Sequence, residues 1–294
     1  MITHANDAPV NPKRVLILGG SGFVGQDLVR HLSQLGIPIQ VLSSGDVDLA
    51  DPLCVGRLKG IISEDDSVVF VSALTPDKGR DIATFTKNIA MVENFCSFLR
   101  ESRCAHVVYI SSDAVYHDDA HPVQEDSCCE PSGFHGMMHL ARERMLEFTL
   151  KDSGIPLVHL RPSLLYGAED THNGYGPNRF ARLAKSGDKI VLFGGGEEKR
   201  DHVYVQDLSR IVAACLTRSS SGILNVATGE STSFHDVADK VAGLSSTPVT
   251  VEETTRANPI THRHFDISVT LKSLPNFQFT PLDDGLKATV KGMA

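Results

Sequence analysis

The chain has 294 residues, a formal net charge of −8 and 41% hydrophobic residues, and it contains no tryptophan. That composition is ordinary for a globular protein, and the length suits one large domain or two closely associated ones. The mild acidity, without a basic stripe, argues against a nucleic-acid partner. No apolar run reaches the ~18–20 residues that a bilayer-spanning helix needs, so we expect no membrane association either.

The N-terminus and the cysteines indicate the compartment. Residues 1–12 are polar and lack the apolar stretch of a secretory signal, so we expect them to form a frayed tail. The six cysteines include no C-x-x-C pair. This pattern favours free thiols in a reducing environment over disulfides or a zinc site. We therefore expect a cytoplasmic protein.

Apolar runs of strand length alternate with helix-period segments through the first half of the chain. The predicted strands lie at 15–18, 39–42, 68–71, 107–110 and 157–160. The predicted helices have apolar faces over 24–35, 82–99 and 138–148. Continuously apolar strands that alternate with helices are typical of a parallel sheet covered on both faces, with right-handed connections. The predicted fold class is therefore α/β, with a doubly wound parallel sheet.

The alternation loosens after Pro162. A helix is expected near 179–185, followed by one more strand at 223–226 and a helix at 234–243. The remaining C-terminal stretch is polar. We interpret this half as a smaller lobe.

A glycine-rich turn stands between the first predicted strand and the first predicted helix. It contains Gly19, Gly22 and Gly25, with Phe23 and Val24 before the last glycine. Such a turn needs glycine for positive φ, for close backbone approach to a pyrophosphate and for tight helix–strand packing. The helix N-terminus then offers N–H groups and a positive dipole end to the phosphates. This strand–turn–helix context predicts a Rossmann-type site for NAD or NADP.

The position of this turn indicates how the chain is divided. We predict an NAD(P)-binding Rossmann domain over 1–165, with its sheet completed by about 201–227. A smaller substrate-binding lobe is expected over 166–294. No linker-like stretch separates the two halves, so we expect them to share an interface.

Five segments follow one another along the chain in a characteristic order. They are the G-x-x-G-x-x-G turn at 19–25, the strand end at 110–116, R-P-x-x-x-Y-G at 161–167, the segment 193–207, and the last strand with its turn at 225–229. Together they resemble the extended short-chain dehydrogenase/reductase family, whose members include sugar-nucleotide epimerases, dehydratases and reductases. The resemblance covers nearly the whole chain. It implies a nucleotide-linked sugar as substrate and a homodimer formed through the two long helices.

The resemblance also implies cofactor contacts beyond the glycine turn. The implied contacts are Asp48 and Leu49 at the adenine, Ala73 after the third strand, and Asn88 on the long helix. An acidic residue at the end of the second strand would indicate NAD, but Ser43 and Ser44 stand there. Serines are able to accept a 2′-phosphate, yet no arginine lies beside them. The choice between NAD and NADP therefore stays open.

The strand-end segment carries two catalytic candidates, Ser112 and Asp113. The resemblance implies that Ser112 hydrogen-bonds the reacting carbonyl or hydroxyl, whereas its alternative role is to satisfy backbone groups. Ala114 replaces the glutamate that follows this aspartate in the family's 4,6-dehydratases. A 4,6-dehydratase is therefore not expected, and reductases and epimerases are favoured.

The family's Tyr-x-x-x-Lys pair is absent from the helix that follows. Helical i, i+4 spacing places both residues on one face, and the aligned positions hold His135 and His139. In one interpretation His135 replaces the tyrosine as acid/base, because imidazole titrates near neutral pH. His139 then hydrogen-bonds the ribose and adds positive charge when protonated. In the alternative interpretation the acid/base function is lost, and the protein binds a nucleotide or nucleotide sugar without turnover.

The same two histidines raise the question of a metal. Histidines at i, i+4, with two more histidines and two aspartates in 117–121, match the spacing of some zinc sites. The glutamate of H-E-x-x-H is missing, however, and loop histidines are usually solvated. We therefore predict no metal site.

Substrate binding is expected from residues around and within the C-terminal lobe. Arginine forks match phosphate oxygens bidentately, and Arg200 has the strongest case because it lies in a matching R-D segment. Asn178 stands where the family often has an asparagine at the diphosphate. Arg161 and Tyr166 are further candidates, although Arg161 has the alternative of pairing with a carboxylate. The expected activity is NAD(P)-dependent oxidation, reduction or epimerisation of a nucleotide-linked sugar, with Ser112 and His135 handling the proton.

Overall fold

The structure is a computed structural model that describes residues 2–257 and 259–293, and it divides into two compact units. Unit 1 comprises Met1–His117, Glu125–Pro162 and Leu208–Val226. Unit 2 comprises Asp118–Gln124, Ser163–Asp207 and Ala227–Ala294. Residues 208–226 return to unit 1, within the stretch 201–227 that was expected to complete its sheet, whereas residues 118–124 join unit 2.

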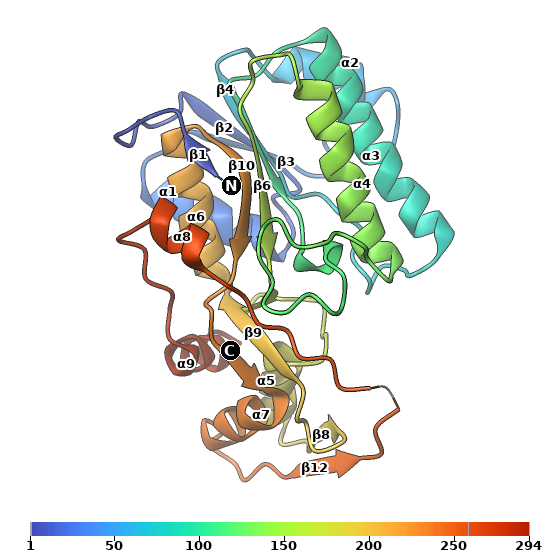
Figure 1. The fold of residues 1–294 in the computed structure, drawn as a ribbon, viewed down its shortest axis with the longest axis vertical. Coiled ribbons are helices and arrows are strands. Elements are labelled where there is room, and N and C mark those ends of the chain that lie inside the picture. The colour runs from blue at the N-terminus through green and yellow to red at the C-terminus, as the bar shows by residue number, and fades with distance from the viewer. Residues whose placement is uncertain (1, 258, 294) are drawn as a thin grey trace. The chain divides into compact units, whose positions relative to one another are not determined.

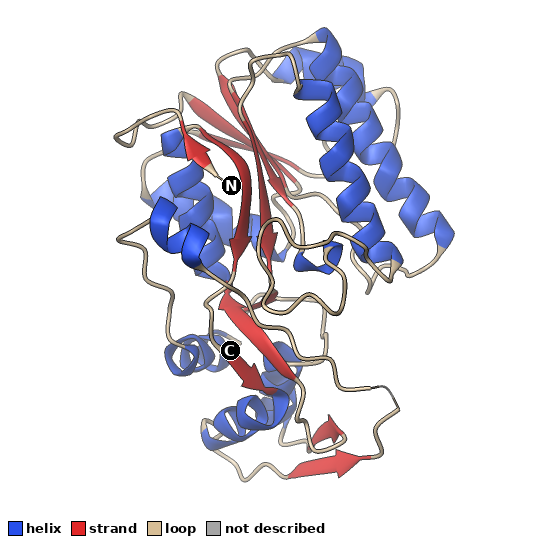
Figure 2. Cartoon of the chain, viewed as in Figure 1, coloured by secondary structure: helices blue, strands red, loops and turns tan. Residues whose placement is uncertain are grey.

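A seven-stranded sheet forms the centre of unit 1, in the order β1-β10-β6-β5-β4-β2-β3 (Figures 1 and 2). Its parallel strands are β2 (Arg14–Leu18), β3 (Ile39–Leu42), β4 (Asp66–Phe70), β5 (His106–Ile110), β6 (Leu157–Pro162) and β10 (Ser220–Val226). Strand β2 lies between β3, at one edge of the sheet, and β4, from which β5, β6 and β10 follow in order toward β1 at the other edge. The predicted doubly wound parallel sheet is confirmed.

The expectation of a frayed N-terminal tail is wrong. Strand β1 (Thr3–His4) pairs antiparallel with β10, so it forms one edge of the sheet. The Ala5 N–H donates to the Arg218 carbonyl at 3.1 Å, and Ile2 is buried. These polar residues form a strand because an edge strand is stabilised mainly by main-chain hydrogen bonds to its one neighbour. The burial of a single apolar side chain, Ile2, accompanies this pairing.

Helices cover both faces of this sheet. The first face carries α2 (Cys54–Ile61), α3 (Ile82–Glu101) and α4 (Phe134–Leu150), with α3 and α4 side by side; the second carries α1 (Phe23–Gln34) and α6 (Val205–Arg218) (Figure 1). The strands are apolar on both sides because both sides are buried. On the first face Phe70 packs with Phe95 and Tyr109, at ring-centroid distances of 5.2 and 5.6 Å. Helices α2 and α6 were not predicted from the sequence.

Helix α3 begins directly after its N-cap residue, Asp81. The Asp81 carboxylate accepts the Thr84 N–H at 2.8 Å, which satisfies one of the N–H groups that a helix start leaves without a partner. Apolar residues then recur along the helix and are buried against the sheet and against α4. The long helices predicted from periodicity at 82–99 and 138–148 are confirmed.

Unit 2 contains two small sheets and, among its described residues, four helices. One sheet has the order β11-β9-β7 and the other pairs β12 with β8. The strands are β7 (Leu164–Tyr166), β8 (Ile190–Phe193), β9 (Lys199–Tyr204), β11 (Ser231–Ser233) and β12 (Val251–Thr254). The helices are α5 (Pro177–Ser186), α7 (Phe234–Gly243), α8 (Ser268–Ser273) and α9 (Leu282–Gly292). Phe180 and Phe234 lie in its core.

Helices α5 and α7 were predicted, whereas the short strands of unit 2 and its last two helices were not. Strands of three or four residues are too short to show a clear apolar alternation. None of the helices among the described residues is both long and apolar enough to span a bilayer.

Candidate functional site

The glycine turn joins β2 to α1 in unit 1, and its glycines meet main-chain atoms closely. Gly19 has φ +94°, and a Cβ there would lie 2.7 Å from the Ser72 nitrogen. A Cβ on Gly25 would lie 2.4 Å from the Gly19 carbonyl oxygen. Both contacts are too short for any side chain, so these positions require glycine. Gly20, which the sequence motif did not single out, is restricted too: its Cβ would lie 2.6 Å from Val41.

The turn fits the diphosphate of a dinucleotide. Gly22 is the N-cap of α1 and supplies no side-chain cap, so the first N–H groups of the helix are not closed off by a capping side chain. Phe23 and Val24 form the half-buried first positions of the helix. The uncapped N–H groups and the positive end of the helix dipole together favour an anion at this place.

The end of β3 is followed by the carboxylate of Asp46, the next acidic residue after Ser43 and Ser44. The Asp46 Oδ2 atom accepts the Ser43 N–H at 2.9 Å and the Ser43 hydroxyl at 2.6 Å. These hydrogen bonds lower the pKa of Asp46. Ser44 is exposed beside it. An acidic group therefore does stand at this strand end, three residues later than expected.

Asp48 and Leu49 take different places. The exposed Asp48 carboxylate accepts the Ala50 N–H at 3.0 Å, while Leu49 is buried in the core under the first face of the sheet. The Leu49 carbonyl accepts a hydrogen bond from Asn94 of α3 at 2.8 Å. The structure thus ties this segment to α3 and leaves the Asp48 carboxylate at the surface.

The loop after β4 is held by Asn88 of α3. The Asn88 Oδ1 atom accepts the Leu74 N–H at 2.9 Å, and its Nδ2 group donates to the carbonyls of Leu74 and Thr84. Arg142 of α4 donates to the same Oδ1 atom at 3.0 Å. All hydrogen-bonding atoms of the amide are therefore engaged by protein. This corrects the expectation of a direct cofactor contact: Asn88 positions the loop that contains Ala73.

The strand end after β5 meets the first turn of α4. Ser112 is the N-cap of the 3₁₀ helix η1 (Asp113–Val115), and its hydroxyl oxygen accepts the Ala114 N–H at 3.1 Å. Gly136 of α4 packs directly on this turn, because a Cβ there would lie 1.9 Å from the Ala114 carbonyl oxygen. This close approach packs η1, which follows Ser112, against the first turn of α4, where His135 precedes Gly136.

A pocket of about 480 Å³ opens beside the same turn in unit 1. His135 and Asn88 contribute to its wall, together with Thr84 and Phe85 of α3 and the loop residue Leu74. His135 is half-buried, so its imidazole lies at the boundary between the protein interior and the pocket. Ser112, the glycine turn and the pocket all belong to unit 1.

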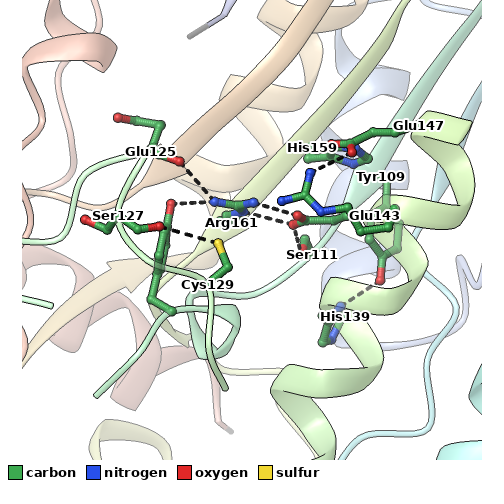
Figure 3. A network of polar contacts seen from close by, with 12 residues as sticks. Tyr109, Ser111, Glu125, Ser127, Cys129, His139, Glu143, Glu147, His159 and Arg161 are labelled. Atoms are coloured by element: carbon green, nitrogen blue, oxygen red, sulfur yellow. Dashed lines mark hydrogen bonds and ion pairs between the residues drawn. The ribbon is translucent and has the colours of Figure 1, made fainter. Parts of the chain in front are cut away.

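His139 lies deeper than the interpretation of a ribose-binding cation requires. It is 4% exposed, and its Nδ1 atom lies 2.7 Å from the Tyr109 hydroxyl of β5 (Figure 3). Burial, followed by the nearby His135 and Arg142, lowers the pKa of His139 well below its ordinary value. This direction disfavours the protonated form in which His139 was expected to add positive charge.

Arg161 belongs to a buried network and does not face a ligand. Its guanidinium makes a bidentate pair with Glu143 of α4, at 2.9 and 2.6 Å (Figure 3). The remaining guanidinium nitrogen donates to the Tyr116 hydroxyl at 2.8 Å. Ser111 donates to Glu143 at 2.6 Å. Burial opposes the charge on Arg161, but the bonds to Glu143 reverse this effect and raise the pKa of Arg161. The predicted substrate contact is wrong, and the carboxylate alternative is confirmed within unit 1.

Two of the substrate candidates in unit 2 are also engaged internally. Asn178 accepts the Gly167 N–H at 2.9 Å and donates to Asp170 at 2.6 Å. Tyr166 is fully buried in the core of unit 2, where its hydroxyl lies against Gly285. Both residues therefore support the lobe, and the expected direct substrate contacts are not what the geometry favours.

Arg200 remains the candidate with an accessible guanidinium. Its side chain is 23% exposed, donates to the carbonyls of Lys199 and Thr261, and forms an ion pair with Glu198. The next residue, Asp201, accepts the N–H groups of Thr228 and Gly229 at 2.9 and 2.8 Å. Within the described ranges, 2–257 and 259–293, no group of three metal-binding side chains lies together.

Sequence reasoning missed Tyr109, Gly136 and Arg142. Gly136 follows His135 directly and lies before the helix face predicted at 138–148, so the apolar period did not mark it. Arg142 is fully buried on the apolar face of α4, which is unusual for arginine. Tyr109 was counted only as a residue of a buried strand, and no local signal marks its hydroxyl.

The glycine turn on a doubly wound parallel sheet defines a Rossmann-type dinucleotide-binding protein. The family model described as the NAD dependent epimerase/dehydratase family matches residues 15–227, which is well over half of the chain. The chain belongs to this family.

Individual relatives agree with that assignment. ADP-L-glycero-D-manno-heptose-6-epimerase from Alkalilimnicola ehrlichii is 27% identical over 265 residues, which cover 77% of this chain and 79% of the relative. The UDP-glucose 4-epimerase of Thermus thermophilus, in complex with NAD, matches with a TM-score of 0.84 at 22% identity, over 95% of this chain and 98% of that one. A GDP-L-fucose synthetase of Naegleria fowleri bound to NADP matches with a TM-score of 0.84 at 18% identity, over 99% and 97%.

Proposed function

We propose that this protein is an NAD(P)-dependent oxidoreductase or epimerase that acts on a nucleotide-linked sugar. The observation that carries the proposal is the junction of η1 and α4. Gly136 packs against Ala114, so the turn that follows the Ser112 hydroxyl meets the first turn of α4, where the His135 imidazole lines the adjacent pocket. The names of the relatives support the substrate class, because each includes a nucleotide-linked sugar or its conversion.

The cofactor would be held by the glycine turn, with its diphosphate at the N-terminus of α1. When bound, the nicotinamide supplies a hydride acceptor or donor for a sugar carbon. The protein contributes orientation and proton transfer. Ser112 hydrogen-bonds the sugar hydroxyl, and neutral His135 takes its proton as that hydroxyl becomes a carbonyl. The reverse transfer, from protonated His135, completes a reduction or an epimerisation.

The imidazole explains how the family's lysine can be absent. A tyrosine needs a nearby cation to bring its pKa toward neutrality, whereas histidine titrates in that range without one. His139 therefore does not have to be charged, in agreement with its burial.

The test is turnover of candidate sugar nucleotides by the purified protein and by His135→Ala. We expect a change in reduced-nicotinamide absorbance for a redox reaction, or a new sugar isomer by NMR for a self-contained epimerase. His135→Ala should lower kcat by about 10²–10⁴-fold, the usual contribution of a general acid/base. His121→Ala, an exposed histidine of unit 2, is the control.

Two results would contradict this assignment. Unchanged turnover in His135→Ala would remove His135 from the mechanism. Tight dinucleotide binding without turnover of any nucleotide sugar would favour the alternative of a catalytically degenerate binding protein. Mass spectrometry of ligands that copurify with the protein would identify the cofactor and the nucleotide to try first.

We also infer a preference for NAD over NADP. The Asp46 carboxylate at the end of β3 would repel a 2′-phosphate, whereas it can accept a hydrogen bond from a ribose hydroxyl. The opposing feature is Arg57, whose guanidinium donates to the Asp46 carbonyl at 3.3 Å and could attract a phosphate.

This preference is tested by measuring Kd for NADH and NADPH by fluorescence. Asp46→Asn should narrow the preference by about tenfold, or 1.4 kcal/mol. Asp51→Asn, another exposed aspartate of the same loop, should leave it unchanged. If the unmodified protein bound NADPH more tightly than NADH, the preference would be set by Arg57 and not by Asp46.

The homodimer and the cytoplasmic location remain proposals. Phe148 of α4 is 85% exposed and Ile82 of α3 is 69% exposed, which supports a partner on these helices. The six cysteines are free thiols, four of them buried, as expected in a reducing compartment. Analytical ultracentrifugation of the protein and of Phe148→Glu tests the dimer: a monomer in both cases would exclude it.

A further inference from the structure

The pocket that His135 lines in unit 1 has mainly apolar walls. It lies between the starts of α3 and α4, which run side by side, and the loop after β4 (Figure 1). Its volume is about 480 Å³. The apolar side chains that line it are Leu74, Pro76, Phe85, Phe134, Met137 and Met138. A pocket of this size accommodates a substantial part of a small-molecule ligand, and such walls favour carbon over hydroxyl groups.

Two aromatic rings and a methionine form the open side of this pocket. The rings of Phe85 of α3 and Phe134 of α4 have centroids 5.6 Å apart, at an interplanar angle of 40°. Phe134 is 43% exposed and Met137 is 40% exposed. Methionine adapts its shape to an apolar neighbour, and a phenylalanine ring offers it a flat surface. These side chains therefore provide an accessible apolar contact directly beside His135.

Polar side chains in the same wall are engaged by the protein. The Asn88 amide is bonded to Leu74, Thr84 and Arg142. The Thr84 hydroxyl donates to the Asp81 carboxylate at 2.8 Å. A sugar hydroxyl that entered here would give up hydrogen bonds to water and find few partners in exchange, which costs free energy. The pocket therefore disfavours a part of the substrate that carries hydroxyl groups.

The rim of the pocket carries charges of both signs. Arg80 and Asp81 are neighbours at the start of α3, and both are exposed. Two opposite charges side by side largely cancel each other's field, so the rim selects neither a carboxylate nor an ammonium group on the sugar. Ser132, which is also exposed, adds an uncharged hydroxyl to the lining. The group that fits this pocket is therefore apolar and uncharged.

The walls are held in place by contacts within unit 1. Asn88 bonds both the N–H and the carbonyl of Leu74. Gly79 packs on the first turn of α3, because a Cβ there would overlap the Thr84 hydroxyl. Gly136 holds the start of α4 on η1 in the same way. A pocket that is already formed needs little ordering when a ligand enters, which favours binding.

We propose that the substrate is a nucleotide sugar that carries an acyl group, and that Phe85, Phe134 and Met137 determine this specificity by binding the acyl chain. The inference rests on the proposed function, since His135 would have to reach the reacting hydroxyl from the wall of this same pocket. The methyl group of a deoxy sugar would leave most of the pocket empty. An acyl group extends further from the sugar ring and presents carbon to the apolar wall.

Methyl NMR of the protein labelled with ¹³C-methyl methionine, in the presence of NAD, tests where the acyl group binds. The probes are UDP-N-acetylglucosamine and UDP-glucose, which differ only by an acetylamino group in place of one hydroxyl. We expect the Met137 signal, assigned by its absence in Met137→Leu, to shift with the acylated probe and not with UDP-glucose. Equal shifts, or no shift with either probe, would overturn the proposal.

The same spectra distinguish a second occupant of the pocket. If another copy of this chain covered the pocket, the Met137 signal would change when the protein is diluted without a probe. That result would also overturn the proposal.

Turnover measures the specificity itself. The value of kcat/KM for UDP-N-acetylglucosamine should exceed that for UDP-glucose by about 10-fold or more, the discrimination that an apolar pocket gives for a small added group. Phe134→Ser should reduce this ratio by about 10-fold, and urea denaturation shows whether the variant is folded. Phe148→Ala is the matched control: it removes an aromatic ring of the same helix that is 85% exposed and does not line the pocket, so the ratio should not change. An unchanged ratio in folded Phe134→Ser would exclude Phe134.

This inference and the proposed function fail in different experiments. A Met137 shift with the acylated probe, without turnover of any nucleotide sugar, would leave the inference standing and contradict the proposed function. Turnover with equal kcat/KM for both probes would support the proposed function and overturn the inference.

Discussion

The start and the middle of helix α4 differ in how far their residues are constrained. At the start, His135 and His139 lie one helical turn apart, and His135 lines a pocket. In the middle, Glu143 is fully buried and its carboxylate is shared by Arg161 and Ser111. A buried charge cannot lose its partner without a large cost, whereas a group at a pocket can change as long as it fits. The fold therefore depends on the middle of α4, whereas the residues of the proposed chemistry lie at its start.

The largest effect is expected when the buried ion pair in the middle of α4 is broken. Glu143→Gln leaves the Arg161 guanidinium buried without its counter-charge, so the free energy of unfolding should fall by about 3–5 kcal/mol. Urea denaturation measures this loss. Glu93→Gln, at an exposed position of α3, should change stability by less than about 0.5 kcal/mol.

Glu143→Gln should nevertheless keep its dinucleotide affinity in whatever fraction stays folded, because Glu143 does not contact the glycine turn. A variant as stable as the unmodified protein would show that the Glu143–Arg161 pair does not hold the fold.

A smaller effect is expected at the junction between the start of α4 and η1. A methyl group on Gly136 would collide with the Ala114 carbonyl, so Gly136→Ala should cost about 1–3 kcal/mol, the usual range for overpacking. It should also reduce kcat, because it shifts Ser112 relative to His135.

The neighbouring Gly133 is the matched control for this junction. It is the N-cap of α4, and a Cβ there would meet nothing within 4 Å. Gly133→Ala should therefore keep both stability and kcat close to their original values. If the two alanine variants behave alike, the close contact at Gly136 does not position the catalytic candidates.

The smallest expected effect is on the pH dependence of the free energy of unfolding. It concerns His139, at the start of α4, and not the ion pair in its middle. The pKa of His139 is lowered by burial, by His135 and by Arg142, so protonation is weaker in the folded than in the unfolded chain. Its contribution to stability is therefore present above about pH 6.5 and is lost as the pH falls below that value. His106, a buried residue of β5 whose pKa is lowered to about 4, adds to the same trend between about pH 6.5 and 4.

We expect His139→Gln to flatten the dependence of unfolding free energy on pH in this window, by up to about 1.4 kcal/mol per pH unit for one proton. Denaturation at a series of pH values provides the slope. His121→Gln, at an exposed position, should leave the slope unchanged. An equal slope in His139→Gln and the unmodified protein would mean that His139 is as easily protonated in the folded state as in the unfolded chain.

Local patterns were enough to predict most of unit 1. The strands that became β2 to β6 are continuous apolar runs, and α3 shows its period over 20 residues. The glycine turn was predictable because its conformation is a property of a few adjacent residues. Helix α6 was missed although it is amphipathic, and the short strands of unit 2 offered no period long enough to detect.

Candidate site residues were predicted less well, since their roles depend on distant partners. Arg161 was considered for substrate because arginine suits phosphate, but it pairs with Glu143, 18 positions earlier. Asn88 was expected at the cofactor, yet Leu74 and Arg142 occupy its amide. Residue type alone does not tell a ligand contact from a buried internal bond.

The sequence by itself determined the doubly wound sheet, the glycine turn for the dinucleotide and the i, i+4 spacing of His135 and His139. These features follow from the order and spacing of residues that are close together in the sequence. Tertiary structure alone decided that His139 is buried against Tyr109, that Arg142 lies beside them without a carboxylate among the described residues, and that Asp46 stands at the end of β3. Each of these depends on which side chains the packing brings within hydrogen-bonding distance, and hydrogen bonds form only at that range.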